Sequence, residues 1–345
     1  MGYPTGYTVP GRYDPLKARV NFIPADTRTG YVQSWHLTTQ WEVIPNLLLD
    51  LGYIGNKSTK LVILADYNQA RPNNVGESLS IQARRPLANY QFIQEAFPGG
   101  MGNYHALQAK LERRFTGGVY LLNSFTWSKG IDNASGHLEV QNGDNSRVNF
   151  RDIKSDKGLS GYNQPFNNTT SFVWDLPYGR GRSYGANIHP VLDSILGGWR
   201  LTGINTMTSG IPINLNYSPI SAQSVSDVPT YRPNITGSIY SSEKSITNYF
   251  DKNAVVTPTD VSKPFGNAGR NIGRSHAFYQ FDMGLHKDFR LFREENKLEF
   301  RAEFFNLLNK TNFQPANGQR TSSAFGTISG TSPARQIQFG LKLYF

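Results

Sequence analysis

The sequence ends in Ile337-Gln338-Phe339-Gly340-Leu341-Lys342-Leu343-Tyr344-Phe345, and this stretch carries the clearest structural pattern in the chain. Every second residue in it is apolar, and the residues between are Gln, Gly, Lys and Tyr. Successive side chains of a β-strand point to opposite faces of a sheet, so the stretch predicts a strand with one apolar and one polar face. The apolar face is predicted to carry Phe339, Leu341, Leu343 and Phe345.

The segments upstream repeat this alternation. Between residues 297 and 304, Lys and Arg alternate with Glu on one face and apolar residues occupy the other. The whole chain predicts an all-β protein of about nine to ten antiparallel strands. The predicted strands are residues 31–42, 47–55, 103–114, 119–129, 166–175, 199–208, 277–287, 297–306 and 335–345, with ambiguous faces in 119–129 and 166–175.

The connections between these strands differ in length in a regular way. Short turns are predicted at 43–46, 115–118 and 288–296, and long loops at 56–102, 130–165, 209–276 and 307–334. Long loops at one end and short turns at the other are typical of outer-membrane barrels. The connection 176–198 departs from the rule, since Pro190, Gly197 and the apolar residues between them predict a short helix.

Composition excludes several classes of protein. The 345 residues include no cysteine, which excludes disulfide frameworks, thiolate zinc sites and cysteine nucleophiles. The net charge is +10, but the longest basic runs are pairs such as Arg84-Arg85, so nucleic-acid binding is not indicated. No apolar run is long enough for a transmembrane helix.

Alternation alone does not say whether the apolar face meets a protein core or lipid. Aromatic residues near the predicted strand ends favour lipid, because such girdles mark membrane interfaces, although a sandwich core is the alternative. They are Trp35, Trp41, Trp127, Trp174 and Trp199, with Tyr53, Tyr104 and Tyr344. In a barrel the polar face would line the lumen, and the candidate lumen-facing residues are Lys297, Glu299, Arg301, Glu303, Asp282, His286 and Lys342.

Several stretches, taken in order, resemble a known family. They are YHALQAKLERRF at 104–115, SFTWSK at 124–129, LPYGRG at 176–181, GGWRLTGI at 197–204, FGNAGRN at 265–271, RAEFFNLLN at 301–309 and the terminal strand. Together they resemble the C-terminal β-barrel portion of TonB-dependent receptors of the Oar-like type, from about residue 20 onward. The resemblance implies a protein of the Gram-negative outer membrane that takes part in substrate uptake.

The resemblance also implies partners. Outer-membrane lipid would surround the apolar face, and the barrel assembly machinery would read the terminal strand that closes on Phe345. TonB would act only through a plug domain, and neither a plug nor a TonB box is recognised. The family's barrels have about 22 strands. We therefore expect residues 1–30 to be an extracellular loop remnant and residues 31–345 to be the C-terminal part of a larger barrel, a fragment.

No motif indicates an enzyme, and no cofactor is expected. The six histidines show no HExxH spacing, and no GxSxG elbow occurs. Acidic residues of one loop are a candidate Ca²⁺ site, although they lack EF-hand spacing and solvated acids are the favoured interpretation: Asp132, Asp144, Asp152 and Asp156. Two alternatives to a transporter segment remain, a secreted all-β module that binds carbohydrate and a truncated barrel without a function of its own.

Overall fold

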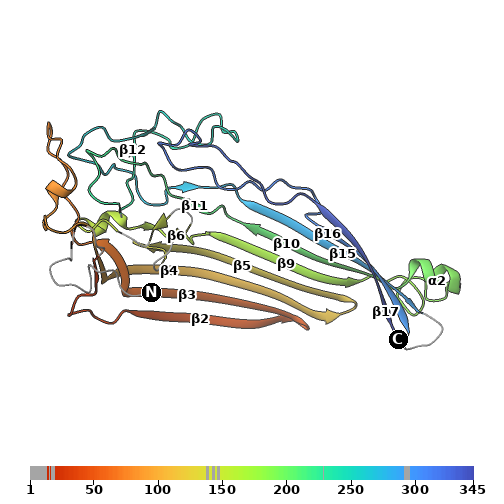
Figure 1. Cartoon of the computed structure of the whole chain (residues 1–345). Coiled ribbons are helices and arrows are strands. Elements are labelled where there is room, and N and C mark those ends of the chain that lie inside the picture. Colours follow the sequence, from red (N-terminus) through yellow and green to blue (C-terminus); the bar gives the residue numbers. More distant parts are fainter. Residues whose placement is uncertain are drawn as a thin grey trace, which may run out of the picture.

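The computed structural model describes residues 14, 16, 20–136, 140–141, 144–145, 148–227, 229–290 and 296–345. Within these residues, nine strands form one antiparallel path in which each strand pairs with the next along the chain (Figure 1). They are β2 (Tyr31–Ile44), β3 (Leu47–Asp66), β4 (Ile93–Thr116), β5 (Val119–Asp132), β9 (Phe166–Asp175), β10 (Trp199–Thr208), β15 (Phe278–Arg290), β16 (Lys297–Phe305) and β17 (Gln336–Tyr344). The predicted all-β class and its strands are confirmed.

The predicted long loop 56–102 is wrong in part, because β3 and β4 continue far into it. The register shifts between Thr59 and Leu61, where Lys60 has a φ of 58°. Beyond this bulge, Ile63 and Ala65 are buried. A strand covered on both faces loses its alternation, so the pattern no longer reveals it.

Short elements form a layer at the loop end of the sheet (Figure 1). β1 (Val20–Phe22) runs parallel to β4 within the predicted loop remnant 1–30, most of which lies outside the described residues. The layer has its own apolar core of buried residues, including Leu215, Phe250, Val255 and Phe325. Its other short elements are β6 (Val140–Gln141), β7 (Asp144–Asn145), β8 (Gly158–Leu159), β11 (Pro212–Ile213), β12 (Asn234–Ile235), β13 (Val255–Val256), β14 (Gly273–Arg274) and the 3-10 helices Gln82–Arg84 and Ile153–Asp156.

The predicted short helix is confirmed as α2 (Pro190–Leu196). Proline occupies its first turn, and the His189 side chain accepts a hydrogen bond from the Val191 amide. α2 lies at the end of the sheet opposite the loop layer (Figure 1). None of the helices in the described part of the chain is long and apolar enough to cross a membrane.

The register assigns each strand residue to a face, because directly opposite residues of an antiparallel pair share one. Between β16 and β17, Phe300 pairs with Leu341 on the apolar face and Glu299 pairs with Lys342 on the polar face. The five tryptophans all lie on the apolar face, together with Tyr53. Tyr104 and Tyr344 lie on the polar face, so their predicted place in an aromatic girdle is wrong.

Candidate functional site

The polar face of β15–β17 carries a network centred on Glu299. The Arg301 guanidinium donates to both carboxylate oxygens of Glu299, at 2.7 Å from Nε and 3.1 Å from Nη2. The Tyr344 hydroxyl donates to Oε2 at 2.7 Å, and His286 Nδ1 lies 3.3 Å from Oε1. The Glu299 side chain is only 10% exposed, so partners from three strands replace the water that it loses.

The other predicted polar residues lie beside this network. Lys297 forms an ion pair with Asp288 at 3.1 Å, and the ammonium groups of Lys297 and Lys342 both lie over the Tyr344 ring. Glu303 accepts a hydrogen bond from the Gln338 amide. Asp282 accepts from the Gln280 side chain and from the Asn306 amide. The structure therefore brings the predicted residues together on one face, and their lumen-facing role stays a prediction.

Charged pairs continue along the same face toward the N-terminal strands, and the sequence analysis did not assign these pairings. Arg200 of β10 donates to Asp175 of β9 at 2.6 Å, directly beside His286 of β15. Lys110 of β4 lies 2.7 Å from Glu112 and 3.8 Å from Asp50. The missed signal was a charged residue next to an aromatic one, as in Trp174-Asp175 and Trp199-Arg200.

The chemistry of this face is that of a polar surface with paired charges. Opposite charges alternate along it, so neighbouring fields largely cancel. No group of three or more His, Asp or Glu side chains arranged to hold a metal ion occurs in the described parts of the chain.

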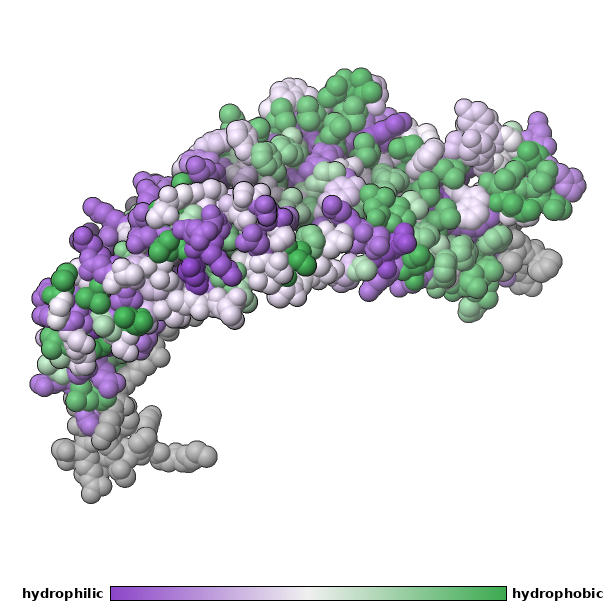
Figure 2. All heavy atoms as spheres, turned by 90° about the horizontal axis from the view of Figure 1, so that it is seen from above, coloured by the Kyte–Doolittle hydropathy of each residue, from purple (hydrophilic) through white to green (hydrophobic). Residues whose placement is uncertain are grey.

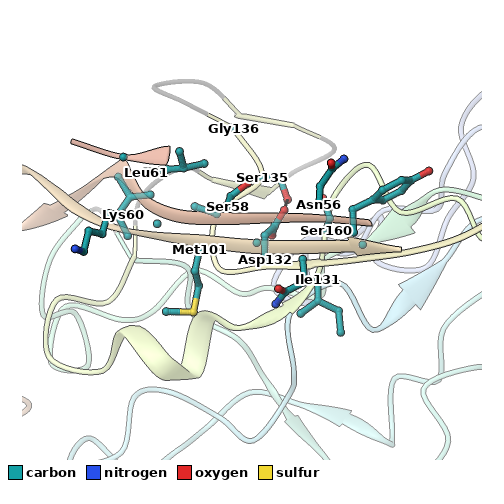
Figure 3. Close-up of a pocket in the computed structure, with 18 of the residues that line it drawn as sticks. Asn56, Ser58, Lys60, Leu61, Met101, Ile131, Asp132, Ser135, Gly136 and Ser160 are labelled. Atoms are coloured by element: carbon teal, nitrogen blue, oxygen red, sulfur yellow. Dashed lines mark hydrogen bonds between the residues drawn. The ribbon is translucent and has the colours of Figure 1, made fainter. Parts of the chain in front are cut away.

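A cavity of about 610 Å³ opens where β3, β4 and β5 approach the loop layer (Figure 3). Ser58, Asp132 and Ser160 line it, and glycines on the neighbouring strands leave room for it. Ser58 and Asp132 belong to the polar face by register. Figure 3 shows Met101 pointing to the opposite side of these strands. The volume is that of a pocket for a small molecule.

Buried arginines fix the loops above this cavity. Arg270 is 3% exposed and donates to the Asp132 carboxylate, to Ser135 Oγ at 2.7 Å and to the Asp156 carbonyl at 2.8 Å. Arg232 pairs with the Asp156 carboxylate at 2.8 Å, with both side chains 6% exposed. Arg270 belongs to the FGNAGRN stretch. The sequence analysis noted this stretch but did not predict that its arginine would bind the acidic residues of another loop.

These contacts argue against the candidate Ca²⁺ site. Asp132 and Asp156 are committed to arginines from a different loop. Asp152 caps a 3-10 helix by accepting a hydrogen bond from the Ser155 amide. The side chain of Asp144 lies outside the described residues. The three described carboxylates, those of Asp132, Asp152 and Asp156, therefore serve separate protein contacts.

The chain matches the family model described as outer membrane beta barrel domain over residues 2–338. A search of curated proteins finds no match. Among solved structures, the chain is similar to the outer membrane transporter YddB from Escherichia coli, with 11% identity, a TM-score of 0.48 and coverage of 94% of this chain and 34% of that one. It is also similar to the FrpB iron transporter from Neisseria meningitidis, with 11% identity, a TM-score of 0.44 and coverage of 94% and 32%. The chain thus spans about a third of the length of these structures.

Proposed function

The chain belongs to the outer membrane beta barrel domain family, and from this premise we propose that it forms part of the wall of a transporter that takes up a substrate. It is a protein of the Gram-negative outer membrane. The observation that carries the proposal is the network of Glu299, Arg301, His286 and Tyr344, which occupies one face of strands whose other face is apolar. Such ionic ladders suit a water-filled lumen, and an apolar face suits lipid.

The substrate enters, in this proposal, at the cavity beneath the loop layer. Small polar side chains such as Ser58 and Ser160 offer hydrogen bonds there without filling the space. From the cavity the substrate passes along the paired charges of the polar face toward the short turns. The role is one of binding and passage, and we expect no catalytic step.

We further propose that additional strands complete the sheet. β2 and β17 are the two ends of the strand path, and every residue of β2 is exposed. An open edge carries unpaired backbone groups, which the hydrocarbon region of a membrane does not tolerate. TonB coupling through a plug, and recognition of the strand before Phe345 by the barrel assembly machinery, are parts of the same proposal.

Cysteine accessibility tests which face is wet, because the chain has no native cysteine to interfere. The polar-face variant is Gln338→Cys and its matched control is Phe339→Cys, the next residue of β17 on the opposite face. In outer-membrane vesicles, a charged, membrane-impermeant maleimide is expected to label Gln338→Cys and to spare Phe339→Cys. Folding of each variant is checked by heat-modifiable migration on a gel.

Equal labelling at both positions, together with a soluble monomer in the absence of detergent, would support the secreted binding module instead. Labelling of Phe339→Cys alone would reverse the assignment of faces. Aggregation of the wild-type chain in every membrane preparation would favour the truncated barrel without a function of its own.

A further inference from the structure

The helix α2 directs its acidic residue, Asp193, toward the protein and exposes its apolar side. At 3.6 residues per turn, the apolar side chains span an arc of about 140°. They are all more than half exposed: Val191 62%, Leu192 51%, Ile195 60% and Leu196 53%. The Asp193 carboxylate instead points to the protein, where it accepts a hydrogen bond from the Arg180 amide at 2.7 Å. A helix on a soluble surface shows the reverse arrangement.

A buried lysine holds this helix against the apolar face of the sheet. Lys287 of β15 pairs with Trp199 and Phe300 on that face, and it is 1% exposed. Its ammonium donates to the Gly197 carbonyl at the end of α2 and lies 5.3 Å from the ring centres of both Trp199 and Phe289. The Trp199 indole also donates to the Ile195 carbonyl at 2.8 Å. The exposed side of α2 is therefore continuous with the apolar face.

We propose that α2 is an interfacial anchor that inserts its apolar side into the phospholipid leaflet facing the periplasm. The leaflet follows from the end of the sheet at which α2 lies, opposite the long loops (Figure 1). Figure 2 shows hydrophobic atoms gathered at that end of the molecule. We expect the apolar side chains of α2 to reach about 5–10 Å into the boundary between headgroups and acyl chains, as in other helices that lie in the plane of the interface.

Charge complementarity supports a phospholipid as the occupant. The connection that leads into α2 carries Arg180 and Arg182, both exposed. Arg182 lies 3.8 Å from the carboxylate of Asp175, at the end of β9, so Arg180 is the cation that this proposal assigns to the lipid. Cations beside an inserted apolar helix face the phosphate groups of the lipid. A second protein chain is the competing occupant, and it makes a different prediction. This inference rests on the proposed membrane location but does not depend on transport.

The test uses a nitroxide on Ile195→Cys in the full chain, in vesicles of phosphatidylethanolamine and phosphatidylglycerol. Ser194→Cys is the matched control, because it is exposed on the side of α2 away from the apolar arc. Power saturation compares collision with oxygen, which concentrates in lipid, against a water-soluble nickel complex. At position 195 the oxygen-to-nickel accessibility ratio is expected to exceed that at position 194 by about tenfold, a partition free-energy difference of about 1.4 kcal/mol.

Equal ratios at the two positions would place α2 in water and overturn the proposal. Low accessibility to both reagents at position 195 would mean contact with protein and would also overturn it. A third label at Leu341→Cys, on the apolar face of β17, separates this result from failure of the membrane location itself. If Leu341→Cys collides with oxygen and Ile195→Cys does not, the barrel is in lipid and only the anchor is refuted.

Discussion

The ion pair between Arg232 and Asp156 is expected to control the stability of the loop layer. It joins two loops that are far apart in sequence, and both side chains are only 6% exposed. Arg232 also donates to the carbonyls of Ala268 and Ser155. Removing one partner of a buried pair leaves an uncompensated charge, which costs about 3–5 kcal/mol. Arg232→Met keeps the aliphatic volume and removes the charge.

Hydrogen exchange measures this cost, because the exchange rate of a protected amide depends on the free energy of local opening. The Gly266 amide donates to the Arg232 carbonyl at 2.9 Å, and this backbone bond does not require the side chain. Arg232→Met is expected to accelerate exchange of the Gly266 amide by at least about 100-fold, since every 1.4 kcal/mol is a factor of ten. Mass spectrometry of peptides that cover residues 264–270, in detergent-solubilised protein, measures the effect. Exchange in β16 is expected to stay unchanged.

Two further variants make the reasoning refutable. The double variant Arg232→Met with Asp156→Leu removes both charges, so it is expected to exchange more slowly than Arg232→Met alone. Arg71→Met is the matched control, because its ion pair with Glu77 has 42% and 29% exposed side chains and solvent screens it. An acceleration below tenfold for Arg232→Met, or a double variant as fast as the single one, would show that the pair does not hold the layer.

Two other predictions concern the sheet and the loop core. Leu341→Arg places a charge on the apolar face, which is proposed to meet lipid, and is expected to lower the free energy of unfolding in vesicles by about 2–4 kcal/mol. Gln338→Arg on the polar face should change it by almost nothing, and equal losses for the two variants would refute the assignment of faces. Burial raises the pKa of Tyr217 and of Tyr249 to about 12, above the unfolded value of about 10. Because only the neutral phenols are favoured in the folded state, their contribution to the free energy of unfolding is complete below about pH 10. It is lost as the pH rises through 12. Absorbance at 295 nm should show phenols that titrate about two pH units late, and a titration identical to that of the denatured chain would contradict this.

Sequence patterns predicted the strands that have one polar and one apolar face. β16 and β17 alternate without a break, so Lys297, Glu299 and Arg301 were placed on one face and Phe339 and Leu341 on the other. The ambiguous faces of 119–129 and 166–175 have a structural cause. Asn123, Asn168 and Thr170 interrupt the apolar face, where the side-chain amide of Asn123 donates hydrogen bonds to Asn168 and Thr170.

Sequence patterns did not predict the parts whose form depends on distant contacts. Ile63 and Ala65 lie on β3 but are buried by the loop layer, so no alternation marks them. The roles of Arg232 and Arg270 follow from acidic partners 76 and 138 residues away, and spacing does not reveal such pairs. Local sequence patterns predict individual strands and helices, whereas the contacts between loops depend on how the whole layer packs.

In the proposed transporter, the distribution of committed and uncommitted polar groups predicts where selectivity would arise. On the wall, Glu299 already has partners from Arg301 and Tyr344, so a solute meets polar groups that are largely satisfied. In the loop layer, Arg270 is equally committed to protein partners. The cavity between them is lined instead by short hydroxyl side chains such as Ser58 and Ser160, which can turn toward a ligand at little cost. Substrate discrimination should therefore change with substitutions at the cavity, and substitutions on the wall should alter passage without altering which substrate binds.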